Sequence, residues 1–310
     1  MLLKQLRYLV ALSQEKHFGN AAQACHVSQP AFSGVIRSLE QHLDLTIVQR
    51  GQRFHGFTPE GEKILKWAHR MLADCESMYQ EIHSDKNEQI GTVRIGAIPT
   101  TISLISLFTN ACLQQHPQIA YNIYSLSTTD ILKRLEDFEL DIGITYLDEN
   151  LSRHFKGIPL FSEDYVFITR DENRFAGRAS LSWAEATSAP LCLLTADMHA
   201  RRSLNEVFRK EHLDITPVVE TNSIFLLYSH VRCTDLCSIV PRSVLCLEEM
   251  RHELTAIPIE PLLQRDVGLI LLRERQSTPV MRTVIDHVVA SNMRDRLHMI
   301  RDSEPTPGLE

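Results

Sequence analysis

The sequence lacks the long apolar segment that a membrane span requires. No run in its 310 residues approaches the ~20 consecutive apolar residues that cross a bilayer. The N-terminus also lacks the basic segment, apolar stretch and small-residue cleavage site that together make a secretory signal. We therefore expect a cytoplasmic protein with no membrane partner. Its length allows two or three compact domains.

Cysteines are few, and the sequence motifs of common enzymes are missing. The seven cysteines are odd in number and irregularly spaced, which argues against a secreted disulfide framework. Cys233 and Cys237 have neither the Cys-x-x-Cys spacing nor a second Cys/His pair, so a redox or metal role is the weaker interpretation. A Gly-x-Ser-x-Gly elbow, a Gly-Lys-Ser/Thr phosphate loop and a glycine-rich dinucleotide turn are absent. We expect no metal, no cofactor, no catalytic residues and no enzymatic activity.

An excess of positive charge is also missing over most of the chain. The formal net charge is -7, which argues against a protein that is basic all over. Residues 1–60 are the exception, because they carry six basic and four acidic side chains. Any contact with nucleic acid should therefore lie in this N-terminal segment, although so small an excess is weak evidence alone.

Residues 1–58 show the pattern of a helix-turn-helix. Apolar residues at helical spacing predict a first helix that begins near Leu3 and closes with Phe18. Gly19-Asn20 marks a break and an N-cap for a short helix that contains Ala21, Ala22 and Ala24. These small side chains let two helices approach closely, and His26-Val27 forms the turn between them.

The helix after this turn has the features of one that contacts DNA. Ser28 can cap it, and Pro30 falls in its first turn, where the missing N–H costs nothing. Its buried stripe consists of Phe32, Val35, Ile36 and Leu39. Gln29, Ser33 and Arg37 line another face, which with Pro30 suits contacts in a major groove. A plain three-helix packing module would show the same pattern, so both interpretations stay open.

A short β-hairpin is predicted after this helix. Residues 43–50 lead into a tight turn at Gly51-Gln52-Arg53, and residues 54–57 return as a strand. Arg50 and Arg53 would then lie near the tip of a wing. Basic wing tips commonly lie against backbone phosphates or in a minor groove.

Residues 59–88 predict one long helix. Thr58 and Pro59 begin it, and apolar residues then recur with a 3.5-residue period. The repeat consists of Ile64, Ala68, Met71, Cys75, Met78 and Ile82. Such a helix would span ~40 Å, which favours an intermolecular seam over packing on its own domain. The polar residues 84–89, which end at Gly91, are the expected hinge.

The N-terminal motifs resemble those of LysR-type transcription regulators. The resemblance rests on Ala21-Ala22-Gln23, Val27-Ser28-Gln29-Pro30-Ala31-Phe32-Ser33, Ile36, Leu39-Glu40, Arg50 and Phe57-Thr58-Pro59-Glu60-Gly61. Asp44 stands where this family usually has glycine, and Ile47-Val48 replaces a Leu-Phe pair. The resemblance covers about 297 residues. It implies a winged helix-turn-helix, a dimer through the linker helix, and a homotetramer on double-stranded promoter DNA.

Residues 91–297 alternate strands and helices, which predicts two α/β lobes. The first lobe is a βαβαβ unit with expected strands at 92–98, 119–124 and 140–145, completed by a strand at 266–272 and a helix at 279–296. The second has expected strands at 165–169, 191–194, 217–220 and 237–240, and helices at 200–211 and 223–231. This arrangement resembles the periplasmic-binding-protein fold that LysR-type regulators use as effector domain. We place lobe I at 91–161 and 266–297, lobe II at 162–265, and a disordered tail at 298–310.

A small-molecule site is expected between the two lobes. Thr100 and Thr101 follow the first strand, where backbone N–H groups, the helix dipole and hydroxyls suit a carboxylate or another small anion. The family resemblance implies the same place. The matching positions are Ser103, Thr128, Tyr146, Thr195, Asn222 and Pro241. Each hydroxyl alone could equally be a plain helix cap.

The favoured hypothesis is a regulator whose DNA-binding pairs respond to a small anionic effector. A redox-responsive regulator of the same fold is an alternative, since the resemblance implies a reactive cysteine near residues 195–200 in peroxide-sensing relatives. Here Met198 and His199 stand in that loop. A solute-binding receptor is a further alternative, but it would need a signal peptide and no helix-turn-helix.

Overall fold

The chain forms two compact units in the computed structural model. The structure describes residues 3–50, 54–83, 89–147, 151–170, 175, 178–246, 253–275 and 277–290. One unit comprises Met1–Asn87 with Glu136–Glu139, and the other comprises Glu88–Leu135 with Leu140–Glu310. Among the described helices, none combines the length and the hydropathy that a membrane crossing needs.

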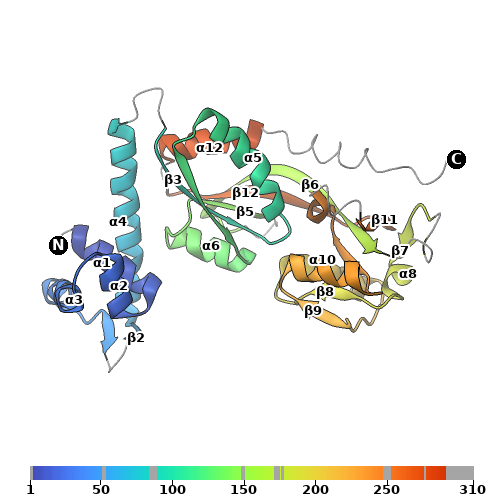
Figure 1. Cartoon of the computed structure of the whole chain (residues 1–310), viewed down its shortest axis with the longest axis horizontal. Helices are drawn as coiled ribbons and strands as arrows, with labels where there is room; N and C mark the ends of the chain where they lie inside the picture. The colour runs from blue at the N-terminus through green and yellow to red at the C-terminus, as the bar shows by residue number, and fades with distance from the viewer. Residues whose placement is uncertain are drawn as a thin grey trace. The chain divides into compact units, whose positions relative to one another are not determined.

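The first unit begins with a three-helix core and a small hairpin (Figure 1). The elements are α1 (Leu3–Glu15), α2 (Phe18–Ala24), α3 (Gln29–Leu43), β1 (Val48–Arg50) and β2 (Phe54–Phe57). Phe32 on α3 is fully buried and stacks on Tyr8 of α1, with ring centroids 4.9 Å apart. Antiparallel pairing of Val48 with Phe57 closes the hairpin. The helix-turn-helix and the wing predicted from the sequence are confirmed.

The start of α2 differs from the prediction. The N-cap is His17 rather than Gly19-Asn20, and its Nδ1 accepts hydrogen bonds from the backbone N–H groups of Gly19 and Asn20. An imidazole in this role satisfies the free N–H groups that Ser, Thr, Asp or Asn usually satisfy. The expected Asn cap is therefore wrong by three residues.

Helix α3 begins as predicted and ends in an unusual conformation. Ser28 Oγ accepts a hydrogen bond from Ala31 N at 3.4 Å, and Pro30 lies in the first turn. At the other end Asp44 adopts the left-handed conformation with φ of 51°. Glycine is the residue that most often takes this position after a helix.

Helices α1 to α3 and the hairpin β1–β2 form the winged domain. The first turns of the long helix α4 (Pro59–His83) pack against it. Thr58 Oγ1 accepts a hydrogen bond from Gly61 N at 2.9 Å. Leu65 and Ala68 are buried in the core of the winged domain. Other apolar side chains of the helix stay exposed: Trp67, Met71, Met78, Tyr79 and Ile82. Packing on its own domain thus holds for the first turns of α4, and the intermolecular seam stays a prediction.

Lobe I of the second unit has the predicted βαβαβ arrangement. Its strands β3 (Gly91–Ala97), β4 (Ile119–Ser125) and β5 (Ile142–Tyr146) are parallel, with β3 in the middle. Between them lie α5 (Ile102–Gln115) and α6 (Thr128–Glu136). Strand β12 (Gln264–Leu272) pairs antiparallel with β5, and α12 (Pro279–Ala290) packs on α5. Residues 291–296 of the predicted last helix lie outside the described residues.

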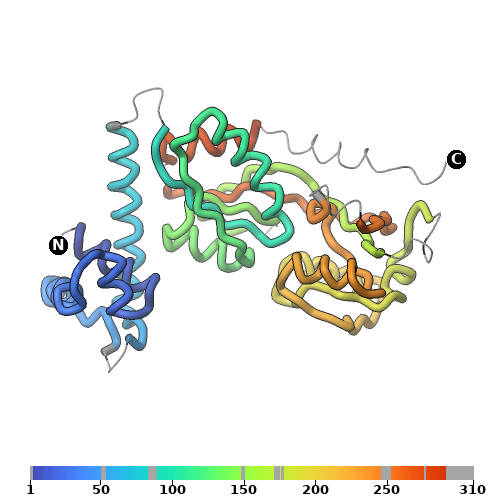
Figure 2. Tube along the Cα trace, viewed as in Figure 1, coloured from blue at the N-terminus to red at the C-terminus, as the bar shows by residue number. Residues whose placement is uncertain are grey.

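Lobe II is joined to lobe I by the long strand β6 (Phe155–Thr169). Its first part pairs with β12 and its last part pairs with β10 and β11, so one strand runs through both lobes (Figure 2). The other elements are β7 (Leu181–Ser182), α8 (Trp183–Thr187), β8 (Cys192–Leu194), α9 (His199–Lys210), β9 (Val219–Thr221), α10 (Ile224–Cys233), β10 (Ser238–Pro241), the 3₁₀ turn η1 (Arg242–Cys246) and β11 (Thr255–Glu260). The sequence predicted only residues 165–169 of β6, and it missed β7, α8, η1 and β11.

Candidate functional site

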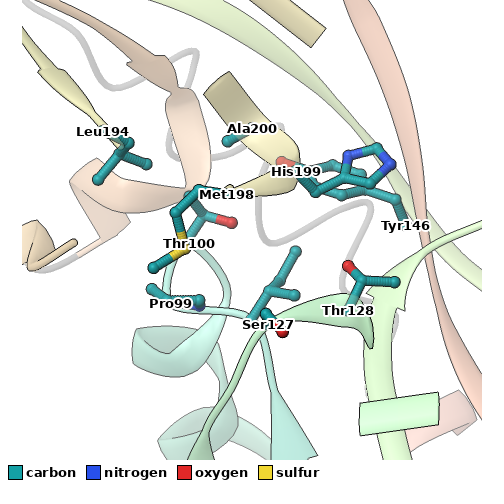
Figure 3. Close-up of a pocket in the computed structure, with 10 residues that line it drawn as sticks. Pro99, Thr100, Ser127, Thr128, Tyr146, Leu194, Met198, His199 and Ala200 are labelled. Atoms are coloured by element: carbon teal, nitrogen blue, oxygen red, sulfur yellow. The ribbon is translucent and has the colours of Figure 1, made fainter. Parts of the chain in front are cut away.

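A pocket lies where the two lobes meet within the second unit (Figure 3). Lobe I contributes Ile98, Pro99, Thr100, Ser127, Thr128 and Tyr146, and lobe II contributes Leu194, Met198, His199 and Ala200. About 260 Å³ around these residues is free of protein atoms, part of it open to solvent.

Three helices begin at the edge of this pocket. Thr100 lies just before α5. Thr128 is the first residue of α6, and His199 is the first residue of α9. Neither Thr101, the N-cap of α5, nor Met198, the N-cap of α9, caps its helix through the side chain. Backbone N–H groups and helix dipoles at such ends favour a negative charge.

The two threonines predicted for this site differ in their surroundings. Thr101 Oγ1 donates a hydrogen bond to the carbonyl oxygen of Ile98 at 3.1 Å, so its hydroxyl is already used. Thr100 is only 2% exposed, and its Oγ1 has no hydrogen-bond partner among the described residues. A buried hydroxyl without a partner is costly, so a ligand in the pocket would satisfy it.

Tyr146 forms a wall of the pocket from the end of β5. The ring of His199 lies beside it (Figure 3). The two rings stack with centroids 4.5 Å apart. The Tyr146 hydroxyl donates a hydrogen bond to Glu163 Oε1 at 2.6 Å. Burial, followed by the charge of Glu163, raises the pKa of Tyr146 well above its usual value. The tyrosine therefore stays neutral and acts as a donor.

Glu163 is the buried acid behind this wall. It is 3% exposed, and Ser243 donates to its Oε2. Burial raises the pKa of Glu163 to about 7, against the lowering effect of the hydrogen bonds from Ser243 and Tyr146. The carboxyl group thus changes its charge near neutral pH.

Of the other predicted pocket residues, Thr128 lines the pocket, while Ser103, Thr195, Asn222 and Pro241 are not among the residues that line it. Ser103 Oγ reaches the carbonyl of Ser243 at 3.5 Å, and Pro241 lies at the end of β10 opposite Tyr165. Thr195 has a buried Oγ1 without a partner in the described part of the chain, while Asn222 is exposed. Thr128 lines the pocket and its hydroxyl lies 2.7 Å from that of Thr145.

In the winged domain, the predicted contact residues share one open face of α3. Gln29, Pro30 and Arg37 are exposed, and Ser33 is half-buried between them. Arg50 ends β1, and Arg53 lies outside the described residues. Since the opposite face of α3 holds the core, the exposed face is free to approach a groove of DNA.

Two family models match the chain and together cover most of it. The model described as "Bacterial regulatory helix-turn-helix protein, lysR family" matches residues 3–62, and "LysR substrate binding domain" matches residues 86–292. The chain belongs to the LysR family. It is thus a DNA-binding transcription regulator with a substrate-binding domain, built from the helix-turn-helix and two-lobed α/β fold expected from the sequence.

LysR-family proteins of known name resemble the chain along nearly its whole length. The regulator OxyR of Escherichia coli K12 is 29% identical over 274 residues, which are 87% of this chain and 89% of OxyR. A full-length OxyR variant from Pseudomonas aeruginosa has a TM-score of 0.71 at 26% identity, covering 94% and 97% of the two chains. CbnR in complex with its target DNA has a TM-score of 0.69 at 18% identity, covering 94% and 100%, and shows the fold alone.

Several pocket residues of this LysR-family chain were not predicted. Ser127 precedes α6 in lobe I. Met198 is the N-cap of α9, and His199 and Ala200 begin it, so the place of these three depends on how α9 meets lobe I. Their position after strand ends was a usable signal, because ligands in open α/β sheets bind beyond the carboxyl ends of strands. Glu163 gave no such signal, since it lies inside a strand that the sequence pattern did not reveal.

Proposed function

We propose that this LysR-family regulator contacts promoter DNA through α3 and the wing, and responds to a small anion in the pocket between its lobes. The contact residues on DNA are Gln29, Pro30, Ser33 and Arg37, with Arg50 and Arg53 at the wing. The regulator acts in the cytoplasm, without enzymatic activity of its own.

The observation that carries the effector proposal is the convergence of three helix starts around one unsatisfied hydroxyl. A carboxylate at Thr100 would accept a hydrogen bond from Oγ1 and lie near the positive ends of α5, α6 and α9. Leu194 and Met198 supply apolar surface for the rest of such a molecule.

Dimerisation is proposed through the exposed apolar residues of α4. Met71, Met78 and Ile82 follow the 3.5-residue period, and they are 37%, 51% and 69% exposed. A second copy of the helix would cover them. Two winged domains related by a dyad can then bind two half-sites, and four copies would form the tetramer expected for the family.

A redox-responsive regulator is the second candidate. One similar E. coli protein carries the name OxyR, and similar proteins of other E. coli strains are named hydrogen peroxide-inducible genes activator. The residues described as lining the pocket include no cysteine. Cys192 and Cys237 are buried, and Cys233 is exposed. A thiol reaction would therefore have to act at a distance from this pocket.

The effector proposal is tested by thermal shift and calorimetric titration with acetate, succinate and benzoate. At least one carboxylate should raise the Tm of the full-length protein. Thr100→Val should weaken that carboxylate about 10-fold or more, because a hydrogen bond to a charged group is lost. The matched control is Thr109→Val, a threonine of α5 whose hydroxyl bonds to the carbonyl of Ile105. Equal affinity in both variants would overturn the proposal, as would the failure of all three acids to bind.

A further inference from the structure

Ser243 lies between the buried acid Glu163 and the pocket segment at Thr100. Its Oγ is within hydrogen-bond distance of Glu163 Oε2 and, at 3.2 Å, of the carbonyl oxygen of Thr100. The Ser243 side chain is 1% exposed, so no solvent competes for its hydroxyl. A serine hydroxyl has a single hydrogen, and it can serve only one of these acceptors at a time.

We propose that Glu163 is a positioning residue for the pocket, which passes its protonation state to the Thr100 segment through the hydroxyl hydrogen of Ser243. The inference rests on the proposed function only in taking Thr100 as part of the effector site. It adds a way in which that site is regulated.

The chain of hydrogen bonds from Glu163 through Ser243 to Thr100, here called the relay, has two states. They differ in the direction of the Glu163–Ser243 bond and in the presence of the Ser243–Thr100 bond. When Glu163 is ionised, Ser243 donates to Oε2 and the Thr100 carbonyl has no donor from Ser243. When Oε2 takes up a proton from water, Glu163 donates to Ser243 Oγ, and Ser243 turns its own hydrogen to the Thr100 carbonyl. Only one proton is gained; its release reverses the Glu163–Ser243 bond and breaks the Ser243–Thr100 bond.

The other side of the carboxyl group is the same in both states. Tyr146 donates to Glu163 Oε1 at 2.6 Å whether or not Oε2 carries a proton. Tyr165 lies 3.3 Å from the Tyr146 hydroxyl and can donate to the carbonyl of Ala200 on the lobe II side of the pocket. Glu163 is therefore fixed by both lobes, while its bond to Ser243 can reverse.

Burial supports a change of protonation in the neutral range, because it raises the pKa of Glu163 to about 7. The ionisable groups around the relay come from five elements: Tyr146 on β5, Tyr165 and Asp164 on β6, Arg265 on β12, His199 on α9 and Arg242 on η1. Helix α5, which follows Thr100, has no charged residue. His199 stacks on Tyr146, which bonds to Glu163, so the test must separate the two residues.

The relay also links the proton to an anion in the pocket. An ionised Glu163 places a negative charge behind Tyr146, and a neutral Glu163 removes it. Proton uptake and anion binding should then favour each other, since coupling between two sites is reciprocal.

The test follows the Thr100 methyl signal in full-length protein labelled with [methyl-¹³C]threonine, without any ligand, across the neutral pH range. The signal is assigned by its loss in Thr100→Val. Infrared spectroscopy of the same samples follows the carboxylic-acid C=O band of Glu163. The wild-type Thr100 signal should shift with a midpoint near pH 7, together with that band.

Variants separate the steps of the relay. In Glu163→Gln, whose amide donates to Ser243 as the neutral acid does, the Thr100 signal should stay at its wild-type low-pH position throughout. In Ser243→Ala the infrared band should still titrate while the Thr100 signal no longer follows it. Ser238→Ala, which removes a buried hydroxyl of β10, and His199→Phe should both keep the wild-type midpoint.

Three results would overturn the relay. The wild-type Thr100 signal does not titrate, it keeps its midpoint in Glu163→Gln, or it keeps its midpoint in Ser243→Ala. Circular dichroism checks the fold of each variant, and the wild-type titration decides even if Glu163→Gln fails to fold. Because no ligand is present, these results stand apart from those of the carboxylate titration. The failure of every carboxylate to bind would leave the relay intact.

Discussion

The ring of His199, at the start of α9 in lobe II, stacks on the ring of Tyr146, at the end of β5 in lobe I. The centroids are 4.5 Å apart and the planes are 28° from parallel. This contact joins the lobes directly at the pocket wall. It therefore couples the distance between the lobes to the shape of the site.

The stack leads to a prediction for effector affinity. His199→Ala removes a ring pair worth about 0.5–1.5 kcal/mol, so it should weaken a bound carboxylate about 2- to 12-fold. His199→Phe should retain most of the affinity, because it keeps the ring. Calorimetry with the carboxylate found by thermal shift measures both. An alanine variant as tight as wild type would show that the stack does not shape the site.

The second prediction concerns Gly61 in the first turn of α4. A Cβ built there would lie 2.2 Å from the carbonyl oxygen of Ile47, far inside van der Waals contact. Gly61→Ala should therefore separate α4 from the wing and lower the Tm of the winged domain. Gly34→Ala is the matched control, since nothing lies within 4 Å of its Cβ. It should stabilise α3 by about 0.5–1 kcal/mol. Differential scanning calorimetry compares them, and equal Tm changes would contradict this account.

At Asp44, unlike at Gly61, the change that removes or adds a side chain is expected to favour glycine through the backbone conformation alone. Its φ of 51° is strained for a residue with a Cβ, and glycine adopts it freely. Asp44→Gly should raise stability by about 0.5 kcal/mol, and Asp44→Val should lower it, because a β-branched residue is worst at this position. Urea unfolding of the full-length protein measures both changes. Destabilisation by glycine would mean that the Asp44 side chain stabilises the helix end.

Much of the winged domain could be predicted from the sequence, because its signals are local. Ser28 caps α3, Pro30 and the stripe that includes Phe32 lie within it, and each acts on its own neighbours. The cap at His17 could not be predicted in this way, since an imidazole accepts backbone N–H groups only in a particular rotamer. The missing part of β6 has a different cause. Gly157 and Pro159 interrupt the strand pattern, and pairing with β12, far along the chain, is what extends the strand.

The pocket was predicted only in part for a related reason. Thr100 and Thr101 are adjacent and chemically identical, so the sequence cannot tell which hydroxyl is used internally. In the structure Thr101 bonds to Ile98, and Thr100 remains available. Glu163 could not be assigned to the site, because its partners Tyr146 and Ser243 come from elements of different lobes. Only the packing of the lobes brings them together.

The buried acid predicts how stability depends on pH. The pKa of Glu163 is raised in the folded protein from its usual 4.5 to about 7. Its stabilising effect is therefore complete below the unfolded value, falls as pH rises between the two, and is lost above the folded value. Glu163→Gln, which never ionises, should gain Tm relative to wild type as the pH rises through this range. Scanning calorimetry against pH checks this. A constant Tm difference would show that Glu163 does not titrate there.

The central claim is that the exposed face of α3 binds the promoter, and a DNA titration tests it most directly. Fluorescence anisotropy would compare wild type, Arg37→Ala and the control Arg209→Ala on the DNA upstream of the protein's own gene and on a shuffled fragment. We expect preference for the upstream DNA, log affinity falling steeply with log salt, and a loss of about 1–3 kcal/mol with relaxed preference in Arg37→Ala only. Equal binding to both fragments by wild type, or an unaffected Arg37→Ala, would contradict the account.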